Sequence, residues 1–483
     1  MATTTLEAPA PGKTPAAIDT KKVIWGVAAL VVAIGLSLVP PPGDLTDSSM
    51  RVLGILAGAV LLWAGRVFHE AAIAVLMSTL FVVAAQVKIT ESFSAFSGTT
   101  FWLLVAAFAL GAAVKECGLL ERISINLLRM FPKSYAGQIL GLLTVTTVTS
   151  PIIPSKAAKC SILSPLVRGM SDASGYKPES KPATGFFLSY YAATCFSPAM
   201  FISASVTTAA LVGLYSDDIQ AEYGFLKWML CALPWIVLIF IGHFFYISRT
   251  YKPAEATKVD SQYLNQRHAE LGRWSAKEKI MGVIMVLTIA IWVFKGQLGV
   301  PEYAAALFAL VASLVFGILP INKWRTSVAW ETLIFIGCCV SLSAVLPAVG
   351  ITDWLVATVG PYTEGFFGQP LLLIPVLAVM TLLVRFLILS EIGFLTVFTA
   401  FLFPLATAAG VNPWVIGFIL NAFVIGWFIP YQSSVYLTAI HAAGEGWVTE
   451  KATTRYCYIY CAIGLVAMLI TYPIWQAMGI WAA

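Results

Sequence analysis

The stretch PIIPSKAAKCSILSPLV, residues Pro151–Val167, decides how we interpret the rest of the chain, because prolines and charged residues interrupt an otherwise apolar segment. The flanking apolar runs, Ile139–Ser150 and Cys160–Val167, are each shorter than the ~20 apolar residues that a membrane-spanning helix needs. Neither run crosses a bilayer alone, so we predict a re-entrant helical hairpin. The tip of this hairpin, Pro154–Lys159, then lies at membrane depth.

The whole chain has the composition of an integral membrane protein. Of its 483 residues, 59% are hydrophobic and 11% are charged, whereas soluble domains carry roughly a quarter charged residues. About eleven apolar stretches can be placed along it as spans. We therefore predict an all-α integral membrane protein, an inverted-repeat secondary transporter with about eleven transmembrane helices and two re-entrant helical hairpins.

The net charge of +5 does not indicate nucleic-acid binding, because the cations lie mostly in loops at the ends of apolar runs. The known excess of Lys and Arg in cytoplasmic loops explains them better. The eight cysteines are scattered through apolar runs, without the spacing of a metal site or a disulfide framework. We predict that they pack as small core residues.

Polarity divides the chain into four segments. Residues 1–22, rich in Ala, Thr and Pro, predict a disordered cytoplasmic tail, and residues 23–248 form the first half of the membrane part. Segment 249–280 is polar, and its excess of cations beside two spans predicts a cytoplasmic linker. Residues 281–483 form the second half. The same rule predicts a multi-pass protein of the inner, plasma membrane with a cytoplasmic N-terminus.

The second half repeats the first. Aligning VKECGLLERI with LPAVGITDWL pairs Gly118 with Gly350, an offset of 232 residues (350 − 118), which also pairs the prolines of CFSPAM and FIPYQS. Between these matches, an offset of 235 residues (390 − 155) pairs Ser155 with Ser390. If the second half contains an odd number of spans, the repeats are inverted, as in many secondary transporters with a central site.

Interruptions of helices at membrane depth are candidate sites, because irregular backbone is tolerated there only where it is buried in protein or lines a cavity. There are four: Pro154–Lys159, Phe196–Met200, Leu389–Gly393 and Pro430–Ser434. Helix N-termini at such breaks direct free N–H groups at an anion. The alternative for each hydroxyl is a bond to its own helix backbone. The polar residues at the breaks are Ser155, Ser161, Thr194, Ser197, Ser390, Thr396, Gln432, Ser433 and Ser434.

Lys156 and Glu391 directly follow the two paired serines, so they occupy equivalent positions at the two predicted tips. An ionisable side chain at this depth costs about 2.5–3.5 kcal/mol on insertion scales and faces a cavity or a partner. Lys156 is a candidate to bind a substrate carboxylate or to replace a coupling cation. Glu391 is a candidate to carry a coupling proton or to bind a cation. The alternative is a buried Lys156–Glu391 ion pair that closes the scaffold. Arg385 is a candidate to pair with Glu391 or to be a second cationic side chain that binds the substrate. The alternative is that its side chain snorkels to the membrane surface.

These segments resemble the divalent anion:sodium symporter family of di- and tricarboxylate transporters. The likeness runs from about Val52 to Trp481; Pro151–Val167 is similar to the first hairpin tip of the family, and Phe386–Leu405 to the second. The resemblance implies inverted repeats, a central anion site between the tips, a homodimer in the lipid bilayer, and elevator movement of the transport part.

The tips depart from the family pattern. The family carries Ser-Asn-Thr motifs that help to bind sodium and substrate carboxylate, whereas this chain has SKA at 155–157 and SEI at 390–392. Because an ammonium group repels sodium, we hypothesise that Lys156 permanently replaces the first sodium ion. This favours exchange, uniport or proton coupling through Glu391 over sodium symport.

We therefore predict a secondary active transporter of a small anion, in the first place a di- or tricarboxylate, with elevator-type alternating access. An inorganic or sulfonated anion as substrate, and a cation/proton antiporter on a related scaffold, stay open. No phosphate-binding loop or metal-binding His pair is present, so we expect no enzyme, no cofactor beyond Na⁺ or H⁺ coupling, and no metal site beyond a sodium site near Ser390 and Glu391. We assign coupling to Lys156, Glu391 and Thr396, and substrate binding to Ser155, Lys156, Ala157, Ser197, Ser390, Glu391, Gln432, Ser433 and Ser434.

Overall fold

The computed structural model describes residues 20–153, 155–255 and 262–482, and its regular structure there is helical apart from one isolated bridge between Val411 and Ala482. The predicted all-α class is confirmed. The first half contains α1 (Thr20–Ser37), α2 (Asp47–Ala64), α3 (Glu70–Val83), α4 (Ile89–Ser92), η1 (Ser94–Ser97), α5 (Thr99–Glu116), α6 (Leu119–Arg129), α7 (Tyr135–Val148), η2 (Ser150–Ile152), α8 (Lys156–Ala173), α9 (Lys181–Phe196), η3 (Ser197–Met200), α10 (Val206–Leu214), α11 (Asp217–Glu222) and α12 (Phe225–Thr250).

The linker helix α13 and the helices of the second half follow. They are α13 (Gln262–Glu270), α14 (Ala276–Val293), α15 (Lys295–Leu298), α16 (Glu302–Val315), α17 (Ile321–Ser327), α18 (Trp330–Val340), α19 (Leu342–Ala348), α20 (Ile351–Phe367), α21 (Pro370–Val384), α22 (Glu391–Ala408), α23 (Pro413–Phe423), η4 (Pro430–Gln432), α24 (Ser434–Ala443) and α25 (Glu450–Ala477).

The apolar runs become helices because backbone N–H and C=O groups find no water in lipid and must pair within the segment. Polar residues fix where these helices begin: Ser134, Ser180 and Thr449 each accept a hydrogen bond from a backbone N–H in the first turn of α7, α9 and α25. Of the eight cysteines, seven are buried and Cys117 is half-buried, and none forms a disulfide. The prediction that they are packing residues is consistent with this placement.

Two segment boundaries differ from the expected ones. α1 begins at Thr20, within the predicted tail 1–22, since Lys21 and Lys22 are good helix formers that extend the apolar run; residues 1–19 of that tail lie outside the described residues. α14 begins at Ala276, before the predicted end of the linker, because Ser275 and Glu278 form a capping box.

Seven helical segments within the described residues are long and apolar enough to cross a membrane: α1, α2, α5, α12, the pair α18–α19, α22 and α25. The helices α20 and α21, bent by 113° at a short break, give up to eight if they form one span. The helices α3, α16 and α23 are apolar but shorter. The count of about eleven spans and the re-entrant character of the two hairpins stay predictions.

The two halves have matching local geometry where the sequence repeat predicts it. Gly118 and Gly350 both adopt the left-handed conformation, with φ of 77° and 75°, immediately before α6 and α20. Further along, α7–α8 corresponds to α21–α22, and the broken segment α9–η3–α10 corresponds to α23–η4–α24. Each of the four predicted interruptions contains the start or end of a helix, although the first and third extend into α8 and α22, the second is filled by η3, and Pro154 lies outside the described residues.

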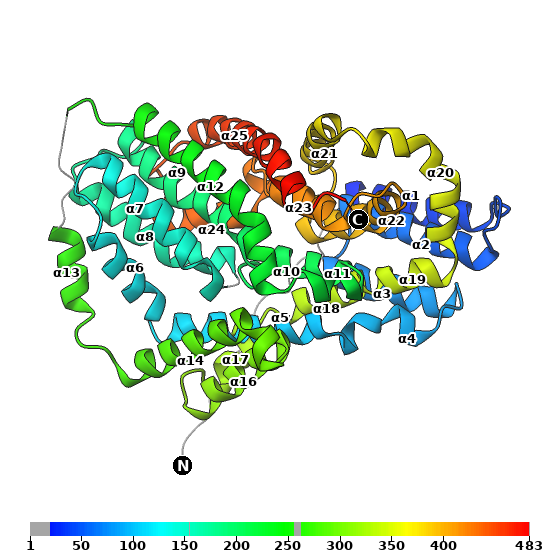
Figure 1. Ribbon diagram of the computed structural model, residues 1–483, viewed down its shortest axis with the longest axis horizontal. Helices are drawn as coiled ribbons and strands as arrows, with labels where there is room; N and C mark the ends of the chain where they lie inside the picture. The colour runs from blue at the N-terminus through cyan, green and yellow to red at the C-terminus, as the bar shows by residue number, and fades with distance from the viewer. Residues whose placement is uncertain (1–19, 154, 256–261, 483) are drawn as a thin grey trace, which may run out of the picture.

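The halves are packed crosswise. The helix α8 of the first half packs against α24 of the second, and α22 of the second packs against α10 of the first. In Figure 1, α7, α8, α9 and α24 accordingly lie together on the left, while α20, α21 and α22 lie on the right. Each hairpin helix thus packs against the broken segment of the other half, which brings all four interruptions toward the centre.

Substitution of Gly118 or Gly350 by Ala tests the left-handed turns. No atom lies within 4 Å of an added Cβ at either position, so the cost is backbone strain alone, about 1–2 kcal/mol. We expect each variant to lower the thermal unfolding midpoint of the purified protein. The control Gly282→Ala, in α14 and equally free of neighbours, should be neutral or stabilising. Equal effects at all three positions would contradict this account.

Candidate functional site

The two predicted tips have the same construction. Ser155 and Ser390 are the N-caps of α8 and α22, and their hydroxyls accept hydrogen bonds from the backbone N–H groups of Ala158 and Gly393 at 3.2 and 3.3 Å. Both serines are half-buried. The residue after each cap begins an 18-residue helix, so Lys156 and Glu391 occupy the first helical position of α8 and α22.

Lys156 and Glu391 meet between the tips. The Nζ of Lys156 lies 2.6 Å from Oε2 of Glu391, and the side chains are 7% and 16% exposed. The hydroxyl of Thr207, in the first turn of α10, donates to the same Oε2 at 2.7 Å. Of the two readings of these charges, the buried ion pair is therefore the geometry observed. It makes the charge of Lys156 unavailable to another anion while the pair is closed.

Four helix N-termini surround this pair. Besides α8 and α22, the helices α10 and α24 begin at the breaks, with Ser205 and Ser433 as N-caps that accept from backbone N–H groups at 3.0 and 3.2 Å. Their position follows from the crosswise packing of α8 on α24 and α22 on α10. Because each N-terminus carries the positive end of a helix dipole, the arrangement favours negative charge.

Arg385 stabilises the second pair of breaks rather than snorkelling to the surface. It is 2% exposed, and its guanidinium donates to the carbonyls of Val424, Ile388 and Gln432 at 2.8, 2.8 and 3.0 Å, and also to that of Leu389. The broken helices leave these carbonyls without a partner in their own helix. One Arg therefore supplies hydrogen bonds to carbonyls at both breaks. It forms no ion pair with a carboxylate among the described residues, so its positive charge adds to the site.

Lys159 is a buried cation that the sequence analysis did not single out. It is fully buried, and its Nζ donates to Ser150 Oγ at 2.9 Å, while Ser150 and Ser197 share a further hydrogen bond. Within the described residues it pairs with no carboxylate. The signal was its position one turn after Lys156 in α8, which places both lysines on one helix face.

The remaining predicted residues separate into three groups. Ser197 and Ser433 are buried at the breaks and bonded to other side chains, of Ser150 and Tyr191. The side-chain N–H₂ of Gln432 has no partner among the described residues and remains available to a ligand. Ala157 is half-buried at the first tip, Thr396 is buried inside α22, Ser434 is exposed, and Ser161 and Thr194 bond to backbone carbonyls of their own helices.

The residues near Ser390 do not fit a sodium site. Sodium needs several oxygen ligands, yet the carbonyl of Leu389 accepts from Arg385, and Oε2 of Glu391 accepts from Lys156 and Thr207. Two cationic side chains thus lie beside the oxygen atoms that would bind the ion and disfavour a second cation there. The expected sodium site near Ser390 and Glu391 is unsupported by this geometry.

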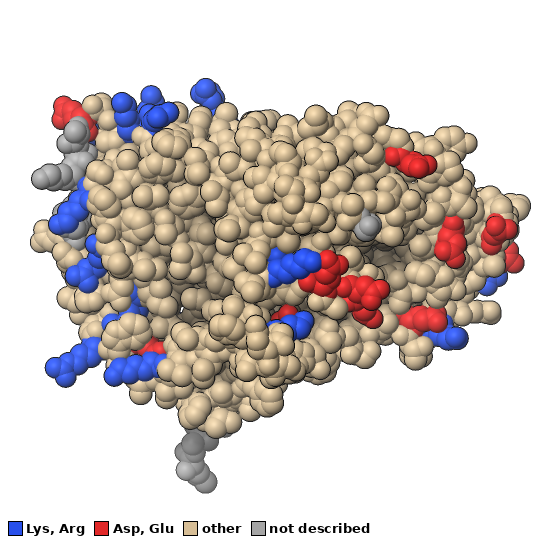
Figure 2. Space-filling view, viewed as in Figure 1, with Lys and Arg blue, Asp and Glu red and all other residues tan. Residues whose placement is uncertain are grey.

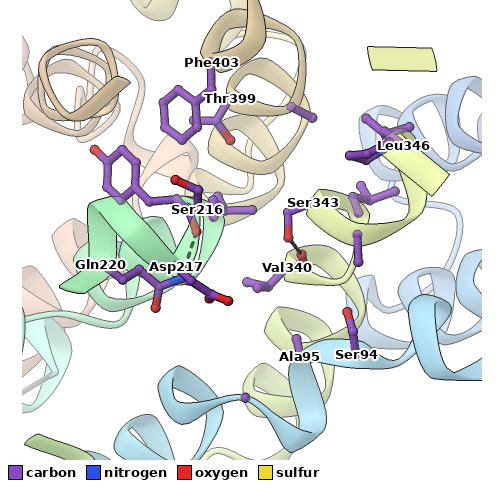
Figure 3. A pocket seen from close by; sticks show the side chains of 18 of the residues that line it. Ser94, Ala95, Ser216, Asp217, Gln220, Val340, Ser343, Leu346, Thr399 and Phe403 are labelled. Atoms are coloured by element: carbon purple, nitrogen blue, oxygen red, sulfur yellow. Dashed lines mark hydrogen bonds between the residues drawn. The ribbon is translucent and has the colours of Figure 1, made fainter. Parts of the chain in front are cut away.

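A large cavity lies beside the tips rather than between them. It has a volume of about 810 Å³ and separates α22 and the α10–α11 turn from α5 and α18–α19. Figure 3 shows Asp217 and Gln220 on one wall, facing Val340 and Ser343 on the other. Asp217 is the only charged residue of its described lining. The cavity is therefore unsuited to hold an anion, but it leaves open space beside the second hairpin.

Comparison with known proteins connects this geometry to a family. A sequence profile described as "Sodium:sulfate symporter transmembrane region" matches residues 20–481. The chain is 28% identical over 410 residues to Escherichia coli inner membrane protein YbhI, covering 81% of this chain and 84% of that protein. It is 26% identical over 427 residues to Arabidopsis thaliana dicarboxylate transporter 1, chloroplastic (85% and 76%), and 24% identical over 347 residues to the putative malate transporter YflS of Bacillus subtilis (70% and 72%).

Two solved structures share the fold. The Neisseria gonorrhoeae MtrF structure superposes with a TM-score of 0.59 at 13% identity, covering 94% of each chain. The Alcanivorax borkumensis YdaH transporter gives a TM-score of 0.57 at 12% identity, covering 95% of this chain and 98% of that one. At these identities the likeness concerns the fold alone.

Substitution of one member of the central ion pair should destabilise the protein more than substitution of both members. Lys156→Met or Glu391→Gln leaves one charge buried without its partner, a cost on the order of 3 kcal/mol, whereas Lys156→Met/Glu391→Met should recover most of it. Thermal unfolding of the purified variants measures this difference.

The exposed pair Lys227–Glu222, with side chains 45% and 50% exposed, supplies the control. Lys227→Met should cost less than about 1 kcal/mol. If the double variant at the tips were as unstable as the worse single variant, the pair would not be the stabilising contact described here.

Proposed function

This chain belongs to the sodium:sulfate symporter family, also called the divalent anion:sodium symporters, and from that membership we propose that it moves a dicarboxylate across the membrane by exchange or proton-coupled transport. The family and the named relatives are transporters, not enzymes. The observation that carries the proposal is the excess of buried positive charge at the tips.

Four buried or nearly buried charged side chains lie at the breaks: Lys156, Lys159 and Arg385 against Glu391. Three cations and one carboxylate leave two positive charges. Buried charge without a counter-ion is unfavourable, so a bound anion of two negative charges relieves that cost. The four helix N-termini around the pair also favour a negatively charged ligand.

A dicarboxylate fits this distribution better than a single point charge. Lys159 lies on the first hairpin with Ser150 and Ser197, whereas Arg385 and Gln432 belong to the breaks of the second half. A dicarboxylate with a short carbon chain can contact the first-half and the second-half side chains at the same time, one with each carboxylate. The names of two relatives, a dicarboxylate transporter and a putative malate transporter, point to the same substrate class. A cation/proton antiporter is disfavoured, because two excess positive charges repel a cation.

Coupling by sodium at the second tip is disfavoured because Arg385 and Lys156 already use the available oxygens. We propose instead that Lys156 alternates between Glu391 and the substrate. When a carboxylate displaces it, Glu391 either takes up a proton or is held by Thr207 and the nearby charge of Arg385. Proton uptake gives symport, and its absence gives exchange, so this step decides the coupling.

Alternating access of the elevator type is supported by the space beside the second hairpin. The cavity of about 810 Å³ between α22 and the helices α5 and α18–α19 leaves room for sliding. Gly118 and Gly350 precede the helices that lead into the hairpins, and neither has a neighbour within 4 Å of an added Cβ. These turns are positions where a movement of the hairpins would be accommodated. The family resemblance also implies a homodimer, which chemical cross-linking tests.

The charge distribution supports a cytoplasmic position for the linker. In Figure 2, Lys and Arg gather at the left end, which holds α6, α7 and α13, whereas Asp and Glu lie mostly over the centre and right. Cytoplasmic ends of membrane proteins carry this excess of cations. The start of α1 shares that side of the membrane if the helices alternate, so the N-terminus is proposed to be cytoplasmic.

The fourth break contacts the loop between α2 and α3. The guanidinium of Arg66, in the α2–α3 loop, lies 5.8 Å from the ring of Tyr431 and 3.5 Å from its carbonyl. The same loop packs against Trp25 near the start of α1. The fourth break therefore contacts the loop on the side of the protein where α1 begins.

Transport by the purified full-length protein in liposomes tests the proposal. Labelled succinate or malate should exchange against internal dicarboxylate without sodium, and Lys159→Met should lower the rate at least tenfold, since it removes one of the two excess charges. Lys181→Met, which removes an exposed lysine of α9, is the matched control and should leave the rate unchanged. Sodium or proton flux without anion movement would refute the anion-transport proposal.

A further inference from the structure

A second cavity lies between the first three helices. The helices α1 and α3 both pack on α2, and a groove of about 660 Å³ remains between them. Its described lining consists of Gly, Ala, Val, Leu, Ile, Met and Phe residues, with Lys22 as the one polar side chain. The transport site uses none of these residues.

Small side chains form the floor of this groove. Gly58 of α2 lies against α1 so closely that an added Cβ would stand 3.0 Å from the Cβ of Ala33 and 3.1 Å from the carbonyl of Ala29. This close approach holds α1 in place, although Ala29 is its only fully buried residue. Since the floor residues are small, the space beside them is left unfilled by the chain itself.

The length of the groove matches one leaflet of a bilayer. On α1 it extends from Lys22 to Ala33, eleven residues (33 − 22) or about 16 Å at 1.5 Å per residue. Half of a hydrocarbon core of about 30 Å is about 15 Å. The groove therefore reaches from the aqueous boundary to the middle of the membrane.

The charge is located at the mouth of the groove. Lys22 is exposed and is the last polar residue before the apolar run of α1, which places its ammonium at the level of lipid headgroups. It forms no hydrogen bond or ion pair with another described residue. A cation in this position attracts a phosphate of an anionic lipid.

We propose that the groove between α1 and α3 binds one anionic phospholipid, with an acyl chain along the floor at Gly58 and the headgroup phosphate at Lys22. A phospholipid matches both features of the groove, since an acyl chain needs an apolar surface one leaflet long and a phosphate needs a cation at its mouth. The bound lipid fills the space that separates α1 from α3 and so fixes α1 to the rest of the membrane part.

Native mass spectrometry of the full-length protein, mixed in detergent with phosphatidylglycerol or phosphatidylcholine, tests this site. We expect the wild-type protein to retain one phosphatidylglycerol at least tenfold better than phosphatidylcholine. Lys22→Ala should abolish that preference. Lys21→Ala, the same change one residue earlier, is the matched control; it lies outside the groove lining and should keep the preference.

A second variant tests the apolar part of the site. Leu30→Trp fills the groove from a side chain that is 61% exposed, so the packing of α1 on α2 is preserved. It should remove retention of both lipids. Equal retention of the two lipids by the wild type, equal behaviour of the Lys21 and Lys22 variants, or cross-linking of two copies through Leu30→Cys would each overturn the proposal.

Discussion

Two opposite charges that meet between the hairpin tips connect the two halves of this transporter. Lys156 begins α8 and Glu391 begins α22, and their contact at 2.6 Å joins segments 235 residues apart. Neither charge is stable alone at this depth, because insertion of an ionisable group into lipid is costly. The contact therefore fixes the two hairpin tips opposite one another, and Thr207 extends it to α10. The crosswise packing of α8 on α24 and of α22 on α10 adds the N-termini of α10 and α24 to the two tips.

The same contact explains why the neighbouring cations matter. With Lys156 paired, Lys159 and Arg385 are the cations that remain without a carboxylate among the described residues. Arg385 is held by backbone carbonyls and Lys159 by the hydroxyl of Ser150, so both side chains are satisfied by hydrogen bonds while their charge is not compensated. The site is thus stable enough to form empty, yet it gains free energy when an anion enters. Stability and anion binding depend on the same side chains.

Much of this could be predicted from the sequence, because the repeat constrains positions that lie far apart. The repeat paired Gly118 with Gly350 and Ser155 with Ser390, and in the structure these equivalent positions are two left-handed turns and two helix caps. The Lys156–Glu391 ion pair is one of the two interpretations that the sequence allows. What the sequence left open was the tertiary partner: Arg385 bonds to a carbonyl 39 residues away, and no local pattern encodes that. Lys159 was missed for a similar reason, since its burial depends on η2 and η3 closing over it.

The charge excess at the tips can be tested most directly by comparing two ligands of one shape. Binding of succinate and of its monoamide, succinamate, to the purified protein should be measured by isothermal titration calorimetry at a pH where both carboxylates of succinate are ionised. If two positive charges are uncompensated between the tips, succinate should bind at least tenfold more tightly, a difference of about 1.4 kcal/mol. Equal affinities for the two ligands would contradict the account, because the site would then not sense the second negative charge.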